Sequence, residues 1–441
     1  MIDKNYEKQI IEMIQNSEGA TIPLIIKDLI QQNTSERTRL LDSWNEYKGE
    51  VPIKFKPKLA NKYAPDNRPV NAYRNLIVSE KVGYLTGVPI EYEYPPDATA
   101  EKMILDFLKI NKYESLDANT MTYLAATGKA FRLLYIGKNF VTAKAELRVT
   151  NQLPWECLVV TDATLDNLPV YGMIYYQVEI KTGGSPKWRW KVEFYDDEEV
   201  SYWIENDSGN FVPDDSYFTP VEKHGFNIMP LVEFNNNLLK YSDFELVRTL
   251  CDAYDNAVSY ALNDNESFSN ALMIFKDVTL TQDLIDKARY LRGIEINSTP
   301  TKPDPSVTYL TKDIKIDNTN ELCKMLEENI FKFSSTVDIY NEAFSGGSVS
   351  GESRKQQLIP LELKCKETER LFQQAVQNEM AVAATYWQKV NNTIVIPSEL
   401  EMTFIRSVIP TEQDNLGTEN TQIEDDDEEE TNNNNNNNEG E

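Results

Sequence analysis

The sequence has 441 residues, of which 41% are hydrophobic and 10% aromatic, so it can bury a sizeable core and should divide into two to four domains. Its 71 acidic residues outnumber its 44 basic residues, and the net charge of −27 argues against a basic cleft that wraps nucleic acid. Four scattered cysteines and a single histidine, His224, argue against zinc sites and histidine-dependent nucleophiles, so we expect no cofactor. The cysteine usage indicates a reduced, intracellular compartment, and we expect neither a signal peptide nor a membrane span.

The first 60 residues are predicted to be helical, because apolar residues recur at helical spacing around Ile10 and again around Leu29, with a break at Pro23. From Pro89 onward the sequence becomes rich in strand-forming residues. Candidate strands are 90–94, 131–135, 172–180 and 187–194, and one helical stretch is expected at about 99–127. Residues 61–241 are therefore predicted to form an α+β region with a mostly antiparallel sheet.

The segment 187–194 alternates strictly, which places Trp188 and Trp190 on one face and lysine and arginine side chains on the other. Gly183-Gly184 before it and Asp207-Ser-Gly209 after the next strand predict hairpin turns. An aromatic and basic platform for single-stranded nucleic acid would have this composition. We favour a core strand, because the alternation puts the aromatic side chains on the buried face and the cations in solvent.

Two long helices are predicted next. The first begins at Ser242, with Glu245 at capping-box spacing, and its apolar stripe continues through Phe275. The second covers residues 318–341. Between them, residues 276–317 form a small proline-rich module with two candidate strands, 293–297 and 307–310.

After the second helix, Ser345–Gly351 has the composition of a mobile loop. A third long helix is predicted over 352–390 with a kink at Pro360, followed by a strand over 401–408. Residues 411–441 contain 12 acidic and no basic residues together with an asparagine run, so this tail is predicted to be disordered.

The sequence offers little evidence for catalytic groups. The acidic clusters Asp196–Glu199 and Asp425–Glu430 lack the spacing of a calcium loop and are more typical of a solvated turn and a tail than of metal sites. His224 is expected to be a surface or packing residue rather than a base. No phosphate-binding loop of the ATPase type occurs, so the chain does not look like an ATPase. Since none of these candidates is convincing, we predict that the chain is not an enzyme.

Several segments taken together resemble the SPP1-type portal proteins of tailed bacteriophages. The densest match is Ile77-Val-Ser-Glu-Lys-Val-Gly-Tyr-Leu-Thr-Gly-Val-Pro-Ile90. The other matching segments are Tyr47–Glu50, Asn67–Tyr73, Gly128–Phe131, Met229–Asn237, Tyr260–Glu266, Gly346–Gly351, Leu358–Glu362 and Met402–Arg406. The resemblance covers about residues 45 to 410, and its specificity lies in the order and spacing of the segments.

The resemblance implies an α+β portal fold in which each predicted segment takes a named part. Residues 1–60 and 61–241 would be the wing, 242–275 and 318–341 the two stem helices, and 276–317 the clip between them. Residues 342–351 would be the tunnel loop, 352–410 the long kinked helix and closing strand, and 411–441 the tail. Because only this short tail follows the closing strand, the helical crown of the family is expected to be reduced or absent.

The resemblance also implies a function. The chain would form a ring of twelve copies at one vertex of the capsid, through which double-stranded DNA is packaged and ejected. Its partners would be the terminase large subunit, the head-completion adaptor protein, and the major capsid and scaffold proteins, without a membrane. Its location would be the virion, and the host cytoplasm during assembly.

Candidate DNA-facing and partner-facing residues follow from the same resemblance. The tunnel-loop candidates are Ser345, Gly346, Gly347, Ser348, Val349, Ser350 and Gly351, with Arg354 and Lys355 behind them as phosphate contacts. The clip candidates are Lys287, Arg289 and Arg292. Polar stem residues such as Asp252, Asp255, Glu321, Glu327 and Glu328 are expected to face solvent or the channel.

Two alternatives remain at this point: another ring-forming neck component of a virion, and a glycan-acting enzyme with paired carboxylates. The acidic residues cluster in turns and in the tail rather than in a cleft, which disfavours the enzyme. Since 12 of the negative charges belong to the tail, residues 1–410 carry −27 + 12 = −15. A DNA channel of this charge would weaken phosphate binding, so the composition argues only against a tight nucleic-acid contact.

Overall fold

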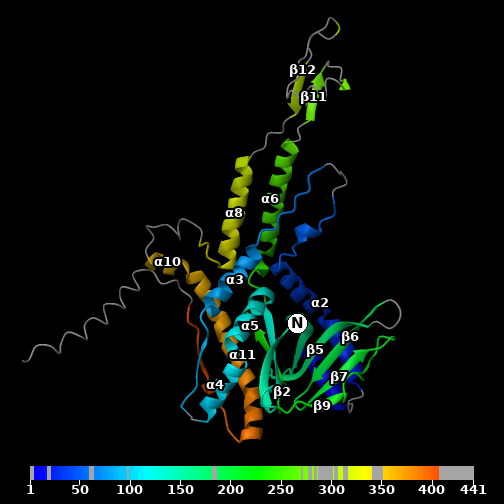
Figure 1. Cartoon of the computed structure of the whole chain (residues 1–441), viewed down its shortest axis with the longest axis vertical. Coiled ribbons are helices and arrows are strands. Elements are labelled where there is room, and N and C mark those ends of the chain that lie inside the picture. Colours follow the sequence, from blue (N-terminus) through cyan, green and yellow to red (C-terminus); the bar gives the residue numbers. More distant parts are fainter. Residues whose placement is uncertain are drawn as a thin grey trace, which may run out of the picture. The chain divides into compact units, whose positions relative to one another are not determined.

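The computed structural model describes residues 4–16, 21–58, 64–96, 99–180, 186–269, 272–276, 281–282, 286, 301, 306–310, 316–339 and 351–406. The chain divides into two compact units (Figure 1). We call Met1–Trp44, Ile77–Asp243 and Ser335–Glu441 the α+β unit, and Asn45–Leu76 with Phe244–Ser334 the helical unit. The mixture of helices and antiparallel sheets confirms the predicted α+β class.

The α+β unit contains most of the secondary structure. Its helices are α1 (Lys4–Asn16), most of α2 (Ile22–Tyr47) and α3 (Tyr73–Thr86), α4 (Ala100–Ile110), α5 (Tyr113–Thr127), α10 (Gly351–Gln357) and α11 (Ile359–Asn391). Its strands are β1 (Glu91–Glu93), β2 (Lys129–Lys138), β3 (Ala145–Gln152), β4 (Cys157–Thr161), β5 (Pro169–Ile180), β6 (Lys187–Tyr195), β7 (Glu199–Glu205), β8 (Phe211–Pro213), β9 (Val221–Lys223), β10 (Leu231–Asn235) and β13 (Glu401–Thr403). Short 3-10 turns lie at Pro154–Glu156 and Pro397–Glu399.

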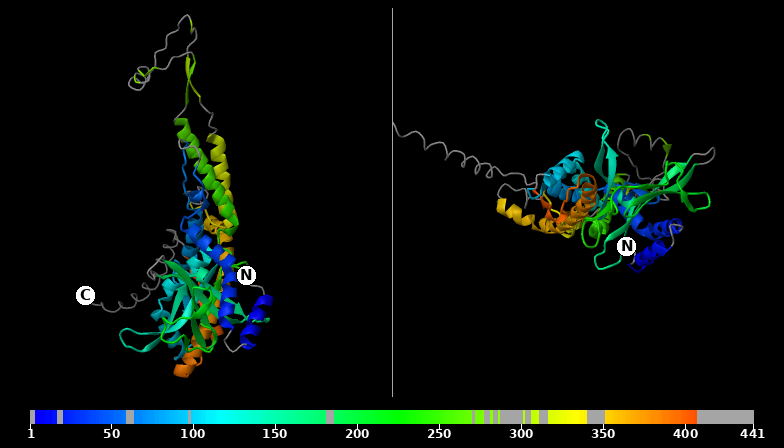
Figure 2. Two further views of the ribbon diagram at one scale, coloured as in Figure 1. Left: turned by 90° about the vertical axis from the view of Figure 1, so that its right-hand side faces the viewer. Right: turned by 90° about the horizontal axis from the view of Figure 1, so that it is seen from below.

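The strands of this unit form three antiparallel sheets. One has the order β10-β2-β3, and a larger one has the order β4-β5-β6-β7-β8 with β9 also paired to β7. In the third, β1 pairs with β13, so residues more than 300 positions apart in the chain close one sheet. Helices α1 and α2 lie alongside the larger sheet in both views of Figure 2 and bury Ile10, Ile26 and Leu29 against it.

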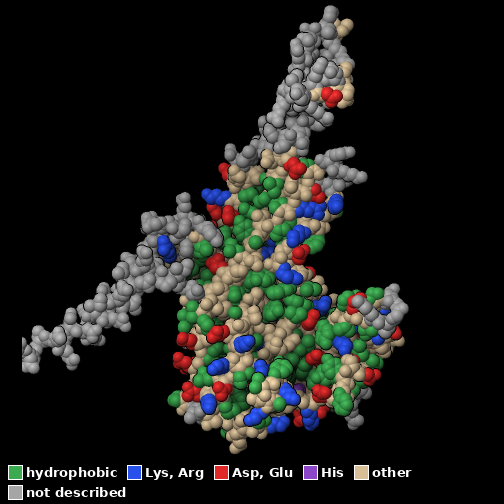
Figure 3. Space-filling model, in the orientation of Figure 1, with side chains coloured by type: hydrophobic (Ala, Val, Ile, Leu, Met, Phe, Trp, Pro, Cys, Tyr) green, Lys and Arg blue, Asp and Glu red, His purple; other side chains and the backbone are tan. Residues whose placement is uncertain are grey.

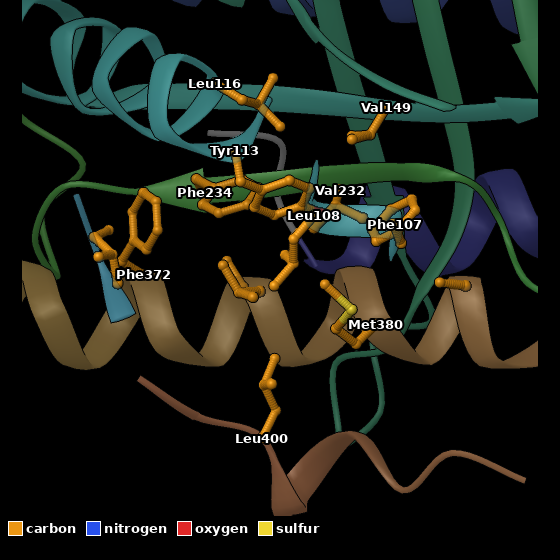
Figure 4. Packing of buried hydrophobic residues seen from close by; sticks show 14 of the residues in the cluster. Phe107, Leu108, Tyr113, Leu116, Val149, Val232, Phe234, Phe372, Met380 and Leu400 are labelled. Atoms are coloured by element: carbon orange, nitrogen blue, oxygen red, sulfur yellow. The ribbon is translucent and has the colours of Figure 1, made fainter. Parts of the chain in front are cut away.

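The main core lies between α11 and the β10-β2-β3 sheet. Phe372 and Met380 of α11 pack against Val232 and Phe234 of β10, with Leu400 beneath the helix (Figure 4). These side chains are almost completely shielded from solvent. Their burial stabilises the unit because each large apolar side chain removed from water contributes roughly 1.5–3 kcal/mol.

Several predicted elements of this unit need correction. The helical stretch at 99–127 is two helices, separated at Lys112, whose φ of 51° is incompatible with a continuing helix. The predicted kink at Pro360 is a break at Leu358, and Pro360 lies in the first turn of α11, where a missing N–H costs no hydrogen bond. Trp188 was predicted to lie on a buried face, but it is 62% exposed. On the same face, Trp190 packs against the core, and Val192 and Phe194 are buried in it.

The helical unit contains the 3-10 turns η1 (Pro52–Phe55) and η3 (Glu245–Val247), helices α6 (Arg248–Ser269) and α8 (Ile316–Ser334), and the strands β11 (Leu272–Lys276) and β12 (Ser306–Leu310). The predicted helix 242–275 is therefore too long at both ends. Asp243 is held in the α+β unit by Lys81, and Leu272 and Phe275 belong to β11, which pairs with β12. Local periodicity favoured a helix through Phe275 because it carries no information about the partner strand β12, where Val307 pairs with Phe275.

The second predicted helix, 318–341, begins at Ile316 and ends at Ser334. Ser335 has a φ of 56°, which stops the helix, and Val337 enters the main core instead of continuing the stripe. Of the helices in the described ranges, none combines the length and the low polarity that a bilayer crossing requires.

Candidate functional site

An aromatic cluster joins the two helices of the helical unit. Tyr73 lies edge-on to Tyr254 of α6 and to Phe331 of α8, with ring centroids 4.9 and 5.9 Å apart. Its hydroxyl donates to Glu327 Oε1 at 3.0 Å, and burial raises the pKa of this phenol well above its ordinary value. Around it, Leu326 and Ile330 of α8 are buried. The pair of helices therefore has its own apolar seam, which Tyr73 closes.

Next to this seam lies a buried charge cluster centred on Arg74, which is 1% exposed. Its guanidinium contacts Glu46 at 2.9 Å and Asp252 at 2.7 Å, and it donates to the backbone oxygen of Arg248 at 3.2 Å. Asp255, 4.0 Å from Arg74, accepts two hydrogen bonds from Asn71. Burial raises the pKa of Asp255 and Glu46, while Arg74 opposes the rise.

The Asn67–Tyr73 segment, one of those that carried the family resemblance, runs along α6 through polar contacts. The backbone N–H of Asn67 donates to Asn263 Oδ1 at 2.7 Å, and its side-chain amide donates to Glu266 at 2.7 Å. Ser259 donates to the backbone oxygen of Asn67, and Arg68 donates to the backbone oxygens of residues 54, 56 and 57. The segment thus links residues 54–57 to the helix.

Apolar side chains also lie on the outer surface of this helix pair (Figure 3). On α8, Leu322, Met325 and Phe333 are 42%, 50% and 57% exposed, and their spacing of three and eight residues places them on one stripe. On α6, Tyr260 is 65% exposed, and Leu246 in the preceding turn is 74% exposed. An exposed apolar stripe on α8, with further exposed apolar residues at α6, is typical of a surface that another protein chain covers.

The predicted polar stem residues are less uniform than expected. Glu321 and Glu328 are exposed, as predicted. Asp255 is 1% exposed and lies in the interior of the unit, so that prediction is wrong. Asp252 and Glu327 are half-exposed, and they also contact Arg74 and Tyr73 respectively. Pairing with a buried arginine and a tyrosine is a long-range effect that the helical spacing of these acids does not show.

The structure describes few of the predicted DNA-facing residues. Ser345, Gly346, Gly347, Ser348, Val349 and Ser350 lie outside the described residues, as do Lys287, Arg289 and Arg292; Gly351 begins α10. Arg354 is half-buried and Lys355 is exposed, both on α10. These assignments therefore remain predictions.

Sequence reasoning missed the most deeply buried charge cluster of the α+β unit. Arg132 of β2 is 0% exposed and pairs with Asp117 at 2.6 Å and Glu379 at 3.0 Å. Tyr92 donates to Asp117, and Tyr113 donates to Glu379. Burial raises the pKa of both carboxyl groups, and Arg132 opposes it. The sequence signal was available: Arg132 stands inside an apolar run, at a position where a central strand is buried on both faces.

Three of the segments that carried the resemblance meet at another ion pair in this unit. Arg406 contacts Glu362 through two nitrogens, at 2.7 and 2.8 Å, and also pairs with Glu369. Tyr84 of α3 donates to Glu362 at 2.9 Å and lies under the Arg406 guanidinium. Arg406 holds the pKa of Glu362 down to about 2. The contact fixes the segment after β13 to α11 and α3.

The remaining chemical candidates have structural roles. Asp196 caps the turn between β6 and β7 by accepting from the backbone N–H groups of Glu198 and Glu199, which confirms the predicted turn. His224 stacks on Phe226 and contacts the backbone oxygen of Asp196, and burial lowers its pKa, as expected for a packing residue. Within the described ranges, no group of three or more histidine, cysteine, aspartate and glutamate side chains is placed to hold a metal ion.

The exposed apolar surface of the helix pair is typical of a subunit that assembles with other protein chains. Comparison with known proteins identifies the family. The family model described as "Phage portal protein, SPP1 Gp6-like" matches residues 26–424. A portal protein of Bacillus phage SPP1 is 22% identical over 361 residues, which span 79% of this chain and 68% of that protein. A portal protein of Clostridium phage phiCD119 is 21% identical over 368 residues, which span 79% of this chain and 77% of that protein. The chain belongs to the SPP1-type family of phage portal proteins.

Proposed function

We propose that copies of this chain form a closed ring, of the twelve subunits that the resemblance to the family implies, at one vertex of a phage head. The observation that supports this proposal is the exposed apolar stripe on α8 of the helical unit, together with two exposed apolar residues at α6. The stripe on α8 comprises Leu322, Met325 and Phe333, and the exposed residues at α6 are Leu246 and Tyr260. Two different surfaces that meet head to tail generate a ring when the rotation between neighbours closes.

In this proposal double-stranded DNA passes through the ring during packaging and ejection, and the protein acts mechanically and electrostatically. The terminase large subunit would supply ATP hydrolysis and dock on the clip, followed later by the head-completion adaptor. The major capsid and scaffold proteins would contact the wing. The protein would be located at the portal vertex of the virion, and in the host cytoplasm during assembly.

The charge distribution is compatible with DNA that slides. The net charge of −15 over residues 1–410 weakens attraction to phosphate. Two exposed acidic residues of α8, Glu321 and Glu328, would add to this repulsion if they line the channel. Arg354 and Lys355 at the start of the long helix are the proposed transient phosphate contacts, behind a tunnel loop at Ser345–Gly351.

Ring formation is tested with mass photometry and negative-stain microscopy of the purified chain. Phe333→Asp places a charge in the α8 stripe and should shift the population from rings to monomers, because an unpaired charge at a desolvated contact is costly. The matched control is Leu165→Asp, which replaces a fully exposed apolar residue of the α+β unit, 103% exposed, and should leave rings intact. Monomers of the wild-type chain at every concentration and salt would refute the proposal.

The tunnel loop is tested separately. A chain in which Ser345–Gly351 is shortened should form normal rings but package less DNA. Packaging at the wild-type level by this variant would remove the role proposed for the loop.

A further inference from the structure

Two neighbouring residues of α3 contact the chain at the two places where it passes between the units. The chain enters the second part of the helical unit after Asp243 and leaves it after Ser334. Lys81 contacts Asp243 itself, and Glu80 contacts Val337, three residues after Ser334. All of these contacts lie inside the α+β unit. Because Glu80 and Lys81 are consecutive, one turn of α3 touches both passages.

At the first passage, the Lys81 ammonium is buried and all its hydrogen-bond donors have acceptors. The Lys81 ammonium is 1% exposed and donates to Asn236 Oδ1 at 2.7 Å, Thr368 Oγ1 at 2.7 Å and Asp243 Oδ1 at 3.2 Å. These three acceptors match the three N–H bonds that an ammonium can donate. Asp243 receives a second cation from Lys364 at 3.3 Å, and the two lysines lower the pKa of its carboxyl group against the effect of burial.

The contact at the second passage has a different character. The Val337 N–H donates to Glu80 Oε1 at 2.8 Å, and the Glu80 carboxyl group is only half-buried. The residues around it are held: Ser334, Thr336 and Val337 are 3%, 7% and 9% exposed, and Val337 packs in the main core. Between them, Ser335 adopts a φ of 56°, a conformation that an L-residue other than glycine keeps only when its neighbours impose it.

We propose that Glu80 and Lys81 are positioning residues that hold the two passages of the chain at fixed points on α3, and we call this pair the α3 clamp. Lys81 forms the stronger contact of the clamp, since its removal would leave the buried Asp243 carboxylate with Lys364 as its remaining cation. Glu80 forms the weaker contact, since a single hydrogen bond to the Val337 N–H holds the segment that follows α8. The inference rests on the proposed function in one respect: the segment that Glu80 anchors leads directly into the proposed tunnel loop.

The charges that face Glu80 determine how firmly it holds. Lys364 of α11 favours the ionised carboxylate, and Asp338 beside Val337 disfavours it. Burial is the largest influence and raises the pKa of Glu80 to about 7. A carboxylate accepts a hydrogen bond more strongly than a carboxylic acid does, so the strength of this contact depends on the protonation of a group that titrates near neutrality.

The first test is amide hydrogen exchange of the full chain, read at Val337 and along α11. Glu80→Ala should increase exchange at Val337 about tenfold, the effect expected for one lost charge-assisted hydrogen bond, while amides of α11 keep their protection. Glu80→Gln retains an acceptor oxygen and should stay within about threefold of the wild type. The matched control is Glu367→Ala, which removes an exposed carboxylate that accepts from the Leu238 N–H at 3.0 Å and should leave Val337 unchanged.

Two results would overturn the clamp. Unchanged exchange at Val337 in Glu80→Ala would show that the contact does not hold the passage. An equal rise in exchange throughout α11 would show that Glu80 merely stabilises the whole unit. Both exchange measurements can be made on monomers. A wild-type chain that stays monomeric would therefore refute the proposed function and leave this test valid.

The second test asks whether the clamp matters to the ring. Glu80→Ala should assemble rings as the wild type does and package DNA at least fivefold less, with Glu80→Gln restoring most of the loss. Packaging by Glu80→Ala at the wild-type level would refute the positioning role. Lys81→Met is expected to reduce the yield of folded protein, so the conclusion depends on the Glu80 variants.

Discussion

Replacement of Arg132 by methionine is the most direct test of how the α+β unit is stabilised. Arg132 is the only cation that the structure shows paired with Asp117 and Glu379, and its guanidinium also lies 4.7 Å from the ring centre of Phe234. Methionine fills much of the same volume but leaves two carboxyl groups buried. Tyr92 and Tyr113 would still donate to them, so each acid would keep one hydrogen bond.

The expected cost follows from these contacts. Removing one partner of a buried ion pair typically costs about 3–5 kcal/mol, because the remaining charge has no compensation. In this cluster two acids lose the same partner, so we expect Arg132→Met to lower the free energy of unfolding by at least about 4 kcal/mol at pH 8. The cost should shrink toward pH 5, since burial already raises the pKa of Asp117 and Glu379 and the loss of Arg132 raises it further. Protonation then removes the uncompensated charge.

Urea unfolding followed by tryptophan fluorescence measures this effect at one fixed protein concentration. The six tryptophans of the chain all lie in the α+β unit, so the signal reports that unit. Arg148→Met is the control, because Arg148 pairs with Glu146 at 2.5 Å but its side chain is 30% exposed. A pair at the surface contributes about 1 kcal/mol or less.

The result has two independent checks. The triple variant Arg132→Met, Asp117→Asn, Glu379→Gln removes every charge of the cluster and should recover more than half of the lost stability. A cost for Arg132→Met no larger than that of the control, or a cost that does not change between pH 5 and pH 8, would refute this account of the cluster.

Two further predictions concern pH. Glu362→Gln breaks the two-point contact with Arg406 and should cost about 1 kcal/mol at pH 7 after allowance for solvent screening. Because the pKa of Glu362 is lowered from 4.5 to about 2, its contribution is present above pH 4.5 and is lost as pH falls toward 2, so the difference in urea unfolding should shrink between pH 5 and pH 3. For Glu80, whose pKa is raised from 4.5 to about 7, the folded state holds its proton more tightly, so its contribution to stability decreases as pH rises through that interval. The protection factor of the Val337 amide, which is corrected for intrinsic exchange, should instead increase as pH rises through about 7. Glu80→Gln should abolish that change. A protection factor that stays constant with pH in the wild type would contradict the prediction.

The sequence by itself predicted most of the elements and their types. The alternation in 187–194 and the helical spacing around Leu29 each report a local backbone geometry, and the structure has a strand and a helix there. Proline at residue 360 predicted an interruption of the long helix, and the structure breaks the helix two residues earlier, with Pro360 in the first turn of α11. The family resemblance also came from the order of local segments, and the family model confirms it.

The tertiary structure alone decided the ends of the long helices and the location of the buried charges. The helix predicted through Phe275 ends at Ser269 because β11 pairs with β12, and the one predicted to 341 ends at Ser334 because Val337 enters the core. Arg132 reaches Glu379, 247 residues away, and Lys81 reaches Thr368, 287 residues away. Spacing along the chain reports which residues share a face of one element; it does not report which face of another element lies opposite. The value of −27 described the whole chain correctly, but only the packed structure shows which charges are buried in ion pairs and which remain exposed.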